Sequence, residues 1–184
     1  MSKSAESSAS SASSASSAAL PIAHVALRIL IVLNWLSGVL IFTLLVATPT
    51  RRWIMSSLDL SPGPEAERVI FGLRSIAFIG LVTIPMHYAV LKRLLDIVQT
   101  VRAGDPFVAV NASRLQAIAW VLLTLQCLSI VIGAIAKAVA VPGHPIDIDA
   151  GFSINGWLAV LLTFLLARVF AEGTLMRDDL EGTV

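Results

Sequence analysis

Charged residues are scarce in this chain, and cysteine is almost absent. Charged side chains make up 14% of the 184 residues, whereas soluble domains carry roughly 25%. The 13 basic and 12 acidic residues leave a net charge of +1, so no positive excess favours direct binding of nucleic acid. The one cysteine, Cys127, cannot form an internal disulfide, and its apolar neighbours indicate a buried packing residue. These shortages predict a protein with little water-facing surface.

Long apolar runs are what the chain has in place of charge. Hydrophobic residues make up 57% of it, and they concentrate in four stretches. Each stretch is near the roughly 20 residues that a helix needs to cross about 30 Å of hydrocarbon. The sequence therefore predicts an all-α polytopic membrane protein, with four transmembrane helices in a bundle and the lipid bilayer as a partner. The apolar stretches are 25–46, 69–90, 115–141 and 152–170.

The first 20 residues form a separate segment that is almost entirely Ser and Ala. Such a segment buries too little apolar surface to offset the entropy of ordering, which predicts a disordered tail. A cleavable signal peptide is the alternative, but the apolar run after Leu20 is too long for one, so we expect a retained first helix. The prediction is thus a tail over 1–20 and a membrane domain over 21–184. Its expected helices are 24–47, 65–102, 112–140 and 153–180.

Polar side chains inside the spans are candidate functional residues. Asn34 and Ser37 are expected to donate hydrogen bonds to another helix. Arg74 has two interpretations: it snorkels to the headgroups, or it pairs with an acidic group such as Glu67 or Asp149. An intramembrane charge is a functional candidate by default. The three candidate intramembrane polar residues are Asn34, Arg74 and Gln126.

The connection between the second and third helices reads as a tight hairpin. Apolar residues at spacings of three and four continue the second helix beyond Tyr88, which predicts an amphipathic extension that leaves the bilayer. Gly104 can end that helix in a left-handed conformation. Asp105-Pro106 then predicts a turn, and Asn111 is a suitable N-cap for the third helix.

The third helix and the connection after it carry three further predictions. Ser129 and Gly133 are small residues four apart, which would let another helix approach closely and favour a homo-oligomer. Apolar and polar residues alternate over 146–149 and 152–155, which predicts a short extracytoplasmic β-like loop before the fourth helix. His144, Asp147 and Asp149 lie in this region without the spacing of a metal site, so neither a metal nor a cofactor is predicted.

The distribution of basic residues predicts the orientation. Four crossings place both termini on one side of the membrane, together with the central hairpin. Eight basic residues fall on that side and five on the other, which favours cytoplasmic termini. The eight are Lys3, Arg28, Lys92, Arg93, Arg102, Arg114, Arg168 and Arg177, and the five are Arg51, Arg52, Arg68, Arg74 and Lys137.

Two polar stretches carry a resemblance to a known family. Residues 104–107, followed by Asn111, Arg114 and Trp120, and the tail over 166–184 resemble the bacterial family catalogued as domain of unknown function 2975. Members commonly show Pro-Glu ahead of the Asn, where this chain has Ala-Val at 109–110. The resemblance implies a four-helix protein of the bacterial inner membrane. It also implies a possible partner, a cytoplasmic helix-turn-helix transcriptional regulator.

These observations favour a non-enzymatic regulatory or adaptor protein over two alternatives. A small transporter or channel formed by self-association is the first alternative, although the polar residues are few and the chain lacks an internal repeat. An enzyme is disfavoured because the three histidines fall on different segments without a base–nucleophile pattern. Phe107 has a second, structural interpretation in which it closes the end of the bundle. The candidate partner-binding residues are Asp105, Pro106, Phe107, Asn111, Arg114, Arg168, Glu172 and Gly173.

The predicted orientation can be tested with alkaline phosphatase fusions, because this reporter is active only outside the cytoplasm. Fusions after Val101 and after Leu180 should both be inactive. A fusion after Ser61, in the first connection, should be active and serves as the control. Opposite activities for the first two fusions would contradict a shared cytoplasmic side.

Overall fold

The computed structural model is helical over most of the residues that it describes, which are 3–46, 52, 55–56, 63–140 and 151–181. No strand occurs among them, and the four long helices are each long and apolar enough to cross a membrane. This confirms the predicted all-helical, multi-pass architecture. The helices are α1 (Lys3–Val46), α3 (Pro64–Arg102), α4 (Ala109–Ala138) and α5 (Ile154–Glu181).

The helix bounds follow the apolar pattern closely, except at the N-terminus. The last three helices begin and end within three residues of the expected 65–102, 112–140 and 153–180. Helix α1 instead begins at Lys3, so the Ser/Ala segment that was expected to be disordered is helical, while the membrane span itself starts at Leu20. Alanine has the highest helix propensity, and extending an existing helix avoids the cost of nucleation. The membrane span thus provides the helical nucleus from which the helix continues into the Ser/Ala segment.

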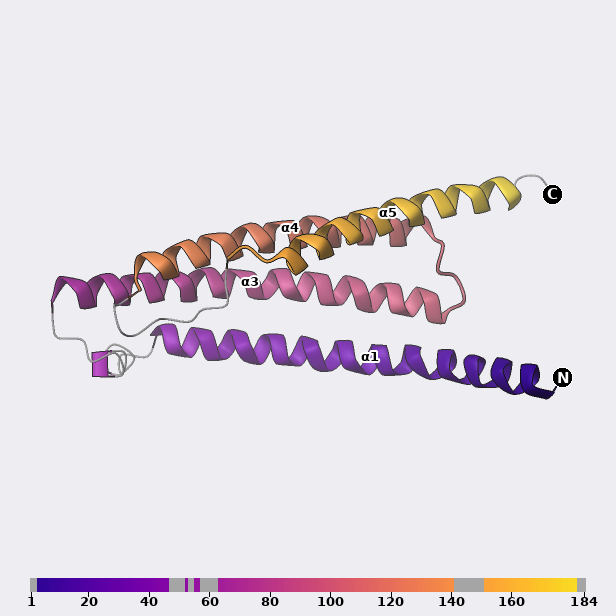
Figure 1. Cartoon of the computed structure of the whole chain (residues 1–184), viewed down its shortest axis with the longest axis horizontal. Coiled ribbons are helices and arrows are strands. Elements are labelled where there is room, and N and C mark those ends of the chain that lie inside the picture. Colours follow the sequence, from indigo (N-terminus) through magenta and orange to yellow (C-terminus); the bar gives the residue numbers. More distant parts are fainter. Residues whose placement is uncertain (1–2, 47–51, 53–54, 57–62, 141–150, 182–184) are drawn as a thin grey trace.

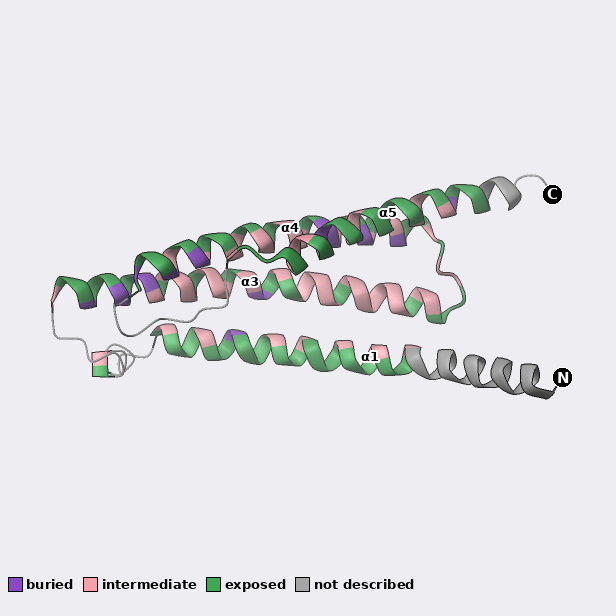
Figure 2. Cartoon of the chain, viewed as in Figure 1, coloured by how far each residue is buried: buried purple, intermediate pink, exposed green. Residues whose placement is uncertain are grey.

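The helices form an open row rather than the closed bundle that the sequence suggested (Figure 1). Helix α1 packs on α3, α3 on α4, and α4 on α5, whereas the described parts of α1 and α5 have no comparable packing on each other. Only 6% of the apolar window of α1 and 11% of that of α5 are buried, against 22% for α3 and α4. Figure 2 shows the same difference as the exposed colour along α1 and α5. The edge helices therefore offer the lipid their apolar sides, which a bilayer tolerates without a closed core.

The contact between α1 and α3 confirms one polar prediction and corrects another. Asn34 Nδ2 donates to the Ile84 carbonyl at 3.0 Å, across the two helices as expected. Ser37 Oγ donates to Leu33 of its own helix at 2.9 Å, so the expected interhelical bond is wrong. A Ser hydroxyl one turn after a carbonyl reaches it more easily than it reaches a neighbouring helix. The amide of Asn34 is longer and reaches α3.

Helix α5 is displaced along α4, so its first turn lies beside the middle of that helix (Figure 1). Gln126 Nε2 donates to the Ser153 carbonyl at 3.5 Å. Ser129 Oγ lies 3.3 Å from the Gly151 carbonyl and accepts from the Gly151 N–H at 3.2 Å. Non-helical backbone at membrane depth needs partners within the protein. The two α4 side chains supply them.

This arrangement corrects two expectations about the second half of the chain. Ser129 bonds to Gly151 of the same chain, and Gly133 is buried within the chain, so neither lies on a free face that would suit self-association. The β-like loop is also wrong over its described part, because Ile154 and Asn155 are already helical. Ser153 caps that helix instead, since its Oγ accepts the Gly156 N–H at 3.2 Å. The rest of the predicted loop, residues 146–150, lies outside the described residues.

Close packing of α3 on α4 generates a stability prediction. A Cβ added at Gly72 would overlap the isopropyl group of buried Val139, whose branched side chain has little freedom to move away. Gly72→Ala should therefore destabilise the protein by about 1–3 kcal/mol, the usual cost of overpacking, measured as a lower thermal unfolding midpoint in detergent. Gly80→Ala is the matched control on the same helix, because its Cβ would lie 3.9 Å from Ile41 Cδ1. Equal midpoints for both variants would contradict the close approach.

Candidate functional site

The loop between α3 and α4 lies against the C-terminal part of α5, at the same end of the row as the start of α1 (Figure 1). Most of the predicted partner-binding residues meet here. We call this assembly the hairpin cluster. It comprises Thr100, Asp105, Pro106, Phe107, Asn111, Arg114, Phe170, Gly173, Thr174 and Arg177.

The loop turns sharply because of one glycine. Gly104 has φ +89°, the left-handed region that favours glycine, and its N–H donates to the Val101 carbonyl at 3.1 Å. The Asp105 N–H donates to the Thr100 carbonyl at 3.2 Å. These bonds satisfy carbonyls at the end of α3 that would otherwise lack donors. The predicted helix end at Gly104 is confirmed, and Asp105 is placed directly after it.

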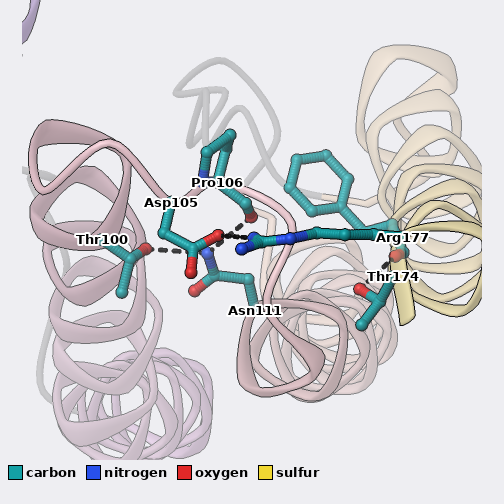
Figure 3. A network of polar contacts seen from close by, with 7 residues as sticks. Thr100, Asp105, Pro106, Asn111, Thr174 and Arg177 are labelled. Carbon is teal, nitrogen blue, oxygen red and sulfur yellow. Dashed lines mark hydrogen bonds and ion pairs between the residues drawn. The ribbon is translucent and has the colours of Figure 1, made fainter. Parts of the chain in front are cut away.

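Asn111 is the buried centre of the hairpin, and it is not the N-cap that the sequence suggested. Helix α4 begins two residues earlier, at Ala109, and Asn111 is 0% exposed. Its Nδ2 donates to Thr100 Oγ1 at 2.7 Å and to the Pro106 carbonyl at 2.9 Å (Figure 3). A fully buried amide needs such partners. Asn111 therefore holds the loop onto α3 and has no surface to offer a partner.

Arg114 extends this network toward α3. Its guanidinium donates to Asn111 Oδ1 at 3.0 Å and lies 3.5 Å from the Asp96 carbonyl. Both acceptors are formally neutral, so the positive charge of Arg114 is oriented without being neutralised by them. The side chain is half-buried, which leaves part of the guanidinium accessible.

An ion pair joins the loop to α5. Arg177 of α5 reaches across to Asp105 of the loop (Figure 3), and each side chain is a little over 40% exposed. The two residues are 72 positions apart, so no local pattern in the sequence indicated the pair. One turn before Arg177, the buried Thr174 turns its hydroxyl to the Phe170 carbonyl at 2.9 Å. Thr174 thereby fills the contact without leaving a buried hydroxyl unpaired.

An aromatic contact fixes the loop beside the ion pair. The rings of Phe107 and Phe170 have centroids 5.3 Å apart and are inclined by 35°, a separation that favours such pairs. Gly173 allows this contact, because a Cβ there would come within 3.1 Å of Phe107 Cδ1. Phe107 thus bridges the loop and α5, which agrees with its structural interpretation, although 43% of it stays exposed.

The two remaining partner-binding candidates lie outside the hairpin cluster. Arg168 Nε and Glu172 Oε1, four residues apart on α5, form an ion pair at 2.7 Å, and their side chains are 77% and 52% exposed. Exposed pairs of this kind add little stability. They give α5 a charged surface near the cluster.

The intramembrane polar candidates do not come together into one path. Asn34 serves the α1–α3 contact and Gln126 the α4–α5 contact. Arg74 is exposed on α3 and forms no ion pair with a described residue, while Asp149 lies outside the described range. Of these three residues, only Gln126 borders a groove of about 600 Å³ between α1, α3 and α4. Thr83, His87 and Ser129 are the other polar side chains on its mostly apolar wall.

The described residues contain no group of three or more metal-ligating side chains. His144, Asp147 and Asp149 lie in a part of the chain that the structure does not describe. Cys127 is exposed on α4, which corrects the expectation of a buried packing residue. In a membrane protein an apolar neighbourhood in sequence also fits a surface that faces lipid.

The buried amide of Asn111 generates a second stability prediction. Asn111→Ala removes the donors of two hydrogen bonds and leaves the Pro106 carbonyl unpaired, which should cost about 1–3 kcal/mol of unfolding free energy. Ser113→Ala is the control, because Ser113 is exposed and its hydroxyl bonds only to Val110, three residues before it. Thermal unfolding in detergent measures both variants. A cost for Asn111→Ala no greater than that of the control would contradict its central place in the hairpin.

Comparisons with known proteins leave the family as a prediction. No protein-family model, no curated protein and no solved structure matches the chain. The resemblance to the family of unknown function thus rests on its two motifs. In the structure, the described parts of those motifs meet each other in the hairpin cluster.

Proposed function

We propose that this protein is a regulatory adaptor of the bacterial inner membrane that binds a cytoplasmic helix-turn-helix regulator at its hairpin cluster. Both termini and the cluster face the cytosol in this proposal. The adaptor performs no chemistry of its own and takes no cofactor. It holds the regulator at the membrane and away from its site of action.

Exposed apolar residues at the cytosolic end carry the proposal. Leu175 and Met176 are each 64% exposed, and Val110 is 48% exposed. All three lie at the end of the row that bears the loop, near the charges of Arg114 and Arg168, and the proposal places this end in water, beyond the hydrocarbon. Apolar groups rimmed by charge on a water-facing surface are typical of protein-binding sites.

The rigidity of the hairpin cluster supports the same interpretation. Asp105–Arg177 and Phe107–Phe170 fix the last turns of α5 on the loop. A surface held in its binding conformation loses less entropy when a partner docks. Phe107 and Asn111 hold the platform, and the regulator binds the apolar residues that the platform presents.

The large groove is the observation that favours the alternative, a small transporter or channel. Its volume of about 600 Å³ and its four polar side chains would suit a small solute. However, Ser129 and Gly133 are used within the chain, which removes the face proposed for self-association. Ion flux in reconstituted vesicles distinguishes the two functions, since an adaptor conducts none.

Cysteine crosslinking in living cells tests the adaptor. In a Cys127→Ala background, Met176→Cys should form a crosslink to a cytosolic protein that mass spectrometry identifies as a helix-turn-helix regulator. Adding Leu175→Ser should reduce the yield at least about tenfold, because losing one well-buried apolar side chain costs about 1.5–3 kcal/mol.

Leu161→Cys is the matched control on the same helix. Leu161 is 66% exposed, but it lies in the apolar part of α5, where lipid covers it. It should crosslink no cytosolic protein. Equal adducts at both positions, or none at Met176→Cys, would contradict the proposal.

A further inference from the structure

A second, smaller pocket lies between α3 and α4, and its lining is rich in positive charge. Its volume is about 380 Å³. Three cationic side chains and one carboxylate line it, which leaves an excess of two positive charges. The lining residues are Tyr88, Ala89, Lys92, Arg93 and Asp96 of α3, and Arg114 of α4.

The positive charges have no anionic partner within the described part of the chain. Arg93 donates to the Ala89 carbonyl of its own helix at 3.1 Å, and Arg114 is held by an amide oxygen and a backbone carbonyl. Lys92 makes no hydrogen bond or ion pair with a described residue. Asp96 likewise forms no ion pair with any of the three. Arg93 and Arg114 are partly buried and held only by neutral acceptors, and Lys92 is exposed beside them. Such a set of cations favours an anion from outside.

The pocket extends from the apolar part of the row toward the hairpin. At one end, Tyr88 contacts Trp35 with centroids 5.8 Å apart, and Trp35 lies within the apolar span Leu20–Val46. At the other end, Arg114 contacts the buried Asn111 of the loop. Tyr88 and Asp96 are eight residues apart, about 12 Å along the helix axis. Trp35 lies near the middle of its apolar span, so the pocket runs from its Tyr88 end, within the apolar part of the row, toward the charged hairpin end, where lipid headgroups are expected.

We propose that this pocket binds the phosphate group of an anionic phospholipid. Arginine guanidinium groups bind phosphate oxygens with two parallel hydrogen bonds, and Lys92 adds a mobile third charge. Basic pockets between membrane helices on the cytosolic side bind such headgroups. A zwitterionic lipid would bring its own ammonium group to a site that already carries excess positive charge, so it binds more weakly. The site stands independently of the adaptor function.

Native mass spectrometry of the full chain in detergent tests the site. The protein is titrated with phosphatidylglycerol, with phosphatidylcholine and with inorganic phosphate in separate experiments. Phosphatidylglycerol should bind the most tightly. Removing both free charges with Lys92→Gln and Arg93→Gln should weaken its binding about 25-fold, since each basic residue near a membrane surface contributes about fivefold. Neither substitution removes a hydrogen bond or an ion pair between helices of the described structure, so the variant should fold.

Arg102→Gln is the control, because Arg102 is an exposed cation on the same helix outside the pocket. It should change phosphatidylglycerol binding by less than twofold. Equal binding of the two lipids, or an equal loss in the control, would overturn the proposal. Inorganic phosphate binding as tightly as phosphatidylglycerol would also overturn it, because the site would then recognise a free anion and not a lipid.

Discussion

Hydrocarbon offers no hydrogen bonds, so every polar group at membrane depth must find its partner within the chain. The structure follows this constraint wherever the backbone leaves the regular helix. Gln126 and Ser129 serve the backbone before α5, and Ser153 caps its first turn. Asn34, the one side-chain amide in α1, donates a hydrogen bond to a carbonyl of α3. Polar side chains of the described spans therefore bond in one of two ways. Asn34, Gln126 and Ser129 bond to another segment, whereas hydroxyls such as those of Ser37 and Thr43 bond to a carbonyl of their own helix.

The two sites that we propose lie at the end of the row that bears the loop between α3 and α4. They lie close together there and share Arg114. One is the hairpin cluster with its exposed apolar residues, and the other is the basic pocket between α3 and α4. Because Arg114 contacts Asn111, the centre of the hairpin, a phosphate bound to Arg114 lies one hydrogen bond away from the platform on which a partner would dock. A lipid and a regulator would therefore bind to adjoining parts of one polar network.

Hydropathy was sufficient to predict the spans, because a membrane helix needs a continuous run of mostly apolar residues. The residue type, and not hydropathy, located the end of α3, because Gly104 adopts the left-handed conformation that favours glycine. Contacts between segments that are far apart in the sequence have no comparable pattern. In the sequence, nothing distinguishes Asp105 from other loop charges or Arg177 from other charges of the tail. The position of α5 in the structure brings the two side chains together.

The errors at Asn111 and Ser129 have a common cause. A side chain that can cap a helix or line a helix contact can equally serve a partner elsewhere in the same chain, as both residues do. The open row could not be predicted from the sequence either, because a helix face that contacts lipid and a face that contacts another helix are both apolar. Whether an apolar side of α1 faces lipid or another helix is decided by the whole arrangement.

The hairpin cluster takes four of its ten residues from α5, which the ribosome makes after the other three long helices. Its loop leaves the ribosome early, but Phe170, Thr174 and Arg177 follow only after the fourth span has been made. The surface is therefore absent from every nascent intermediate and forms only when α5 has been inserted in the correct direction. A protein that recognises this surface would by the same contact distinguish molecules in which α5 has been inserted from molecules in which it has not.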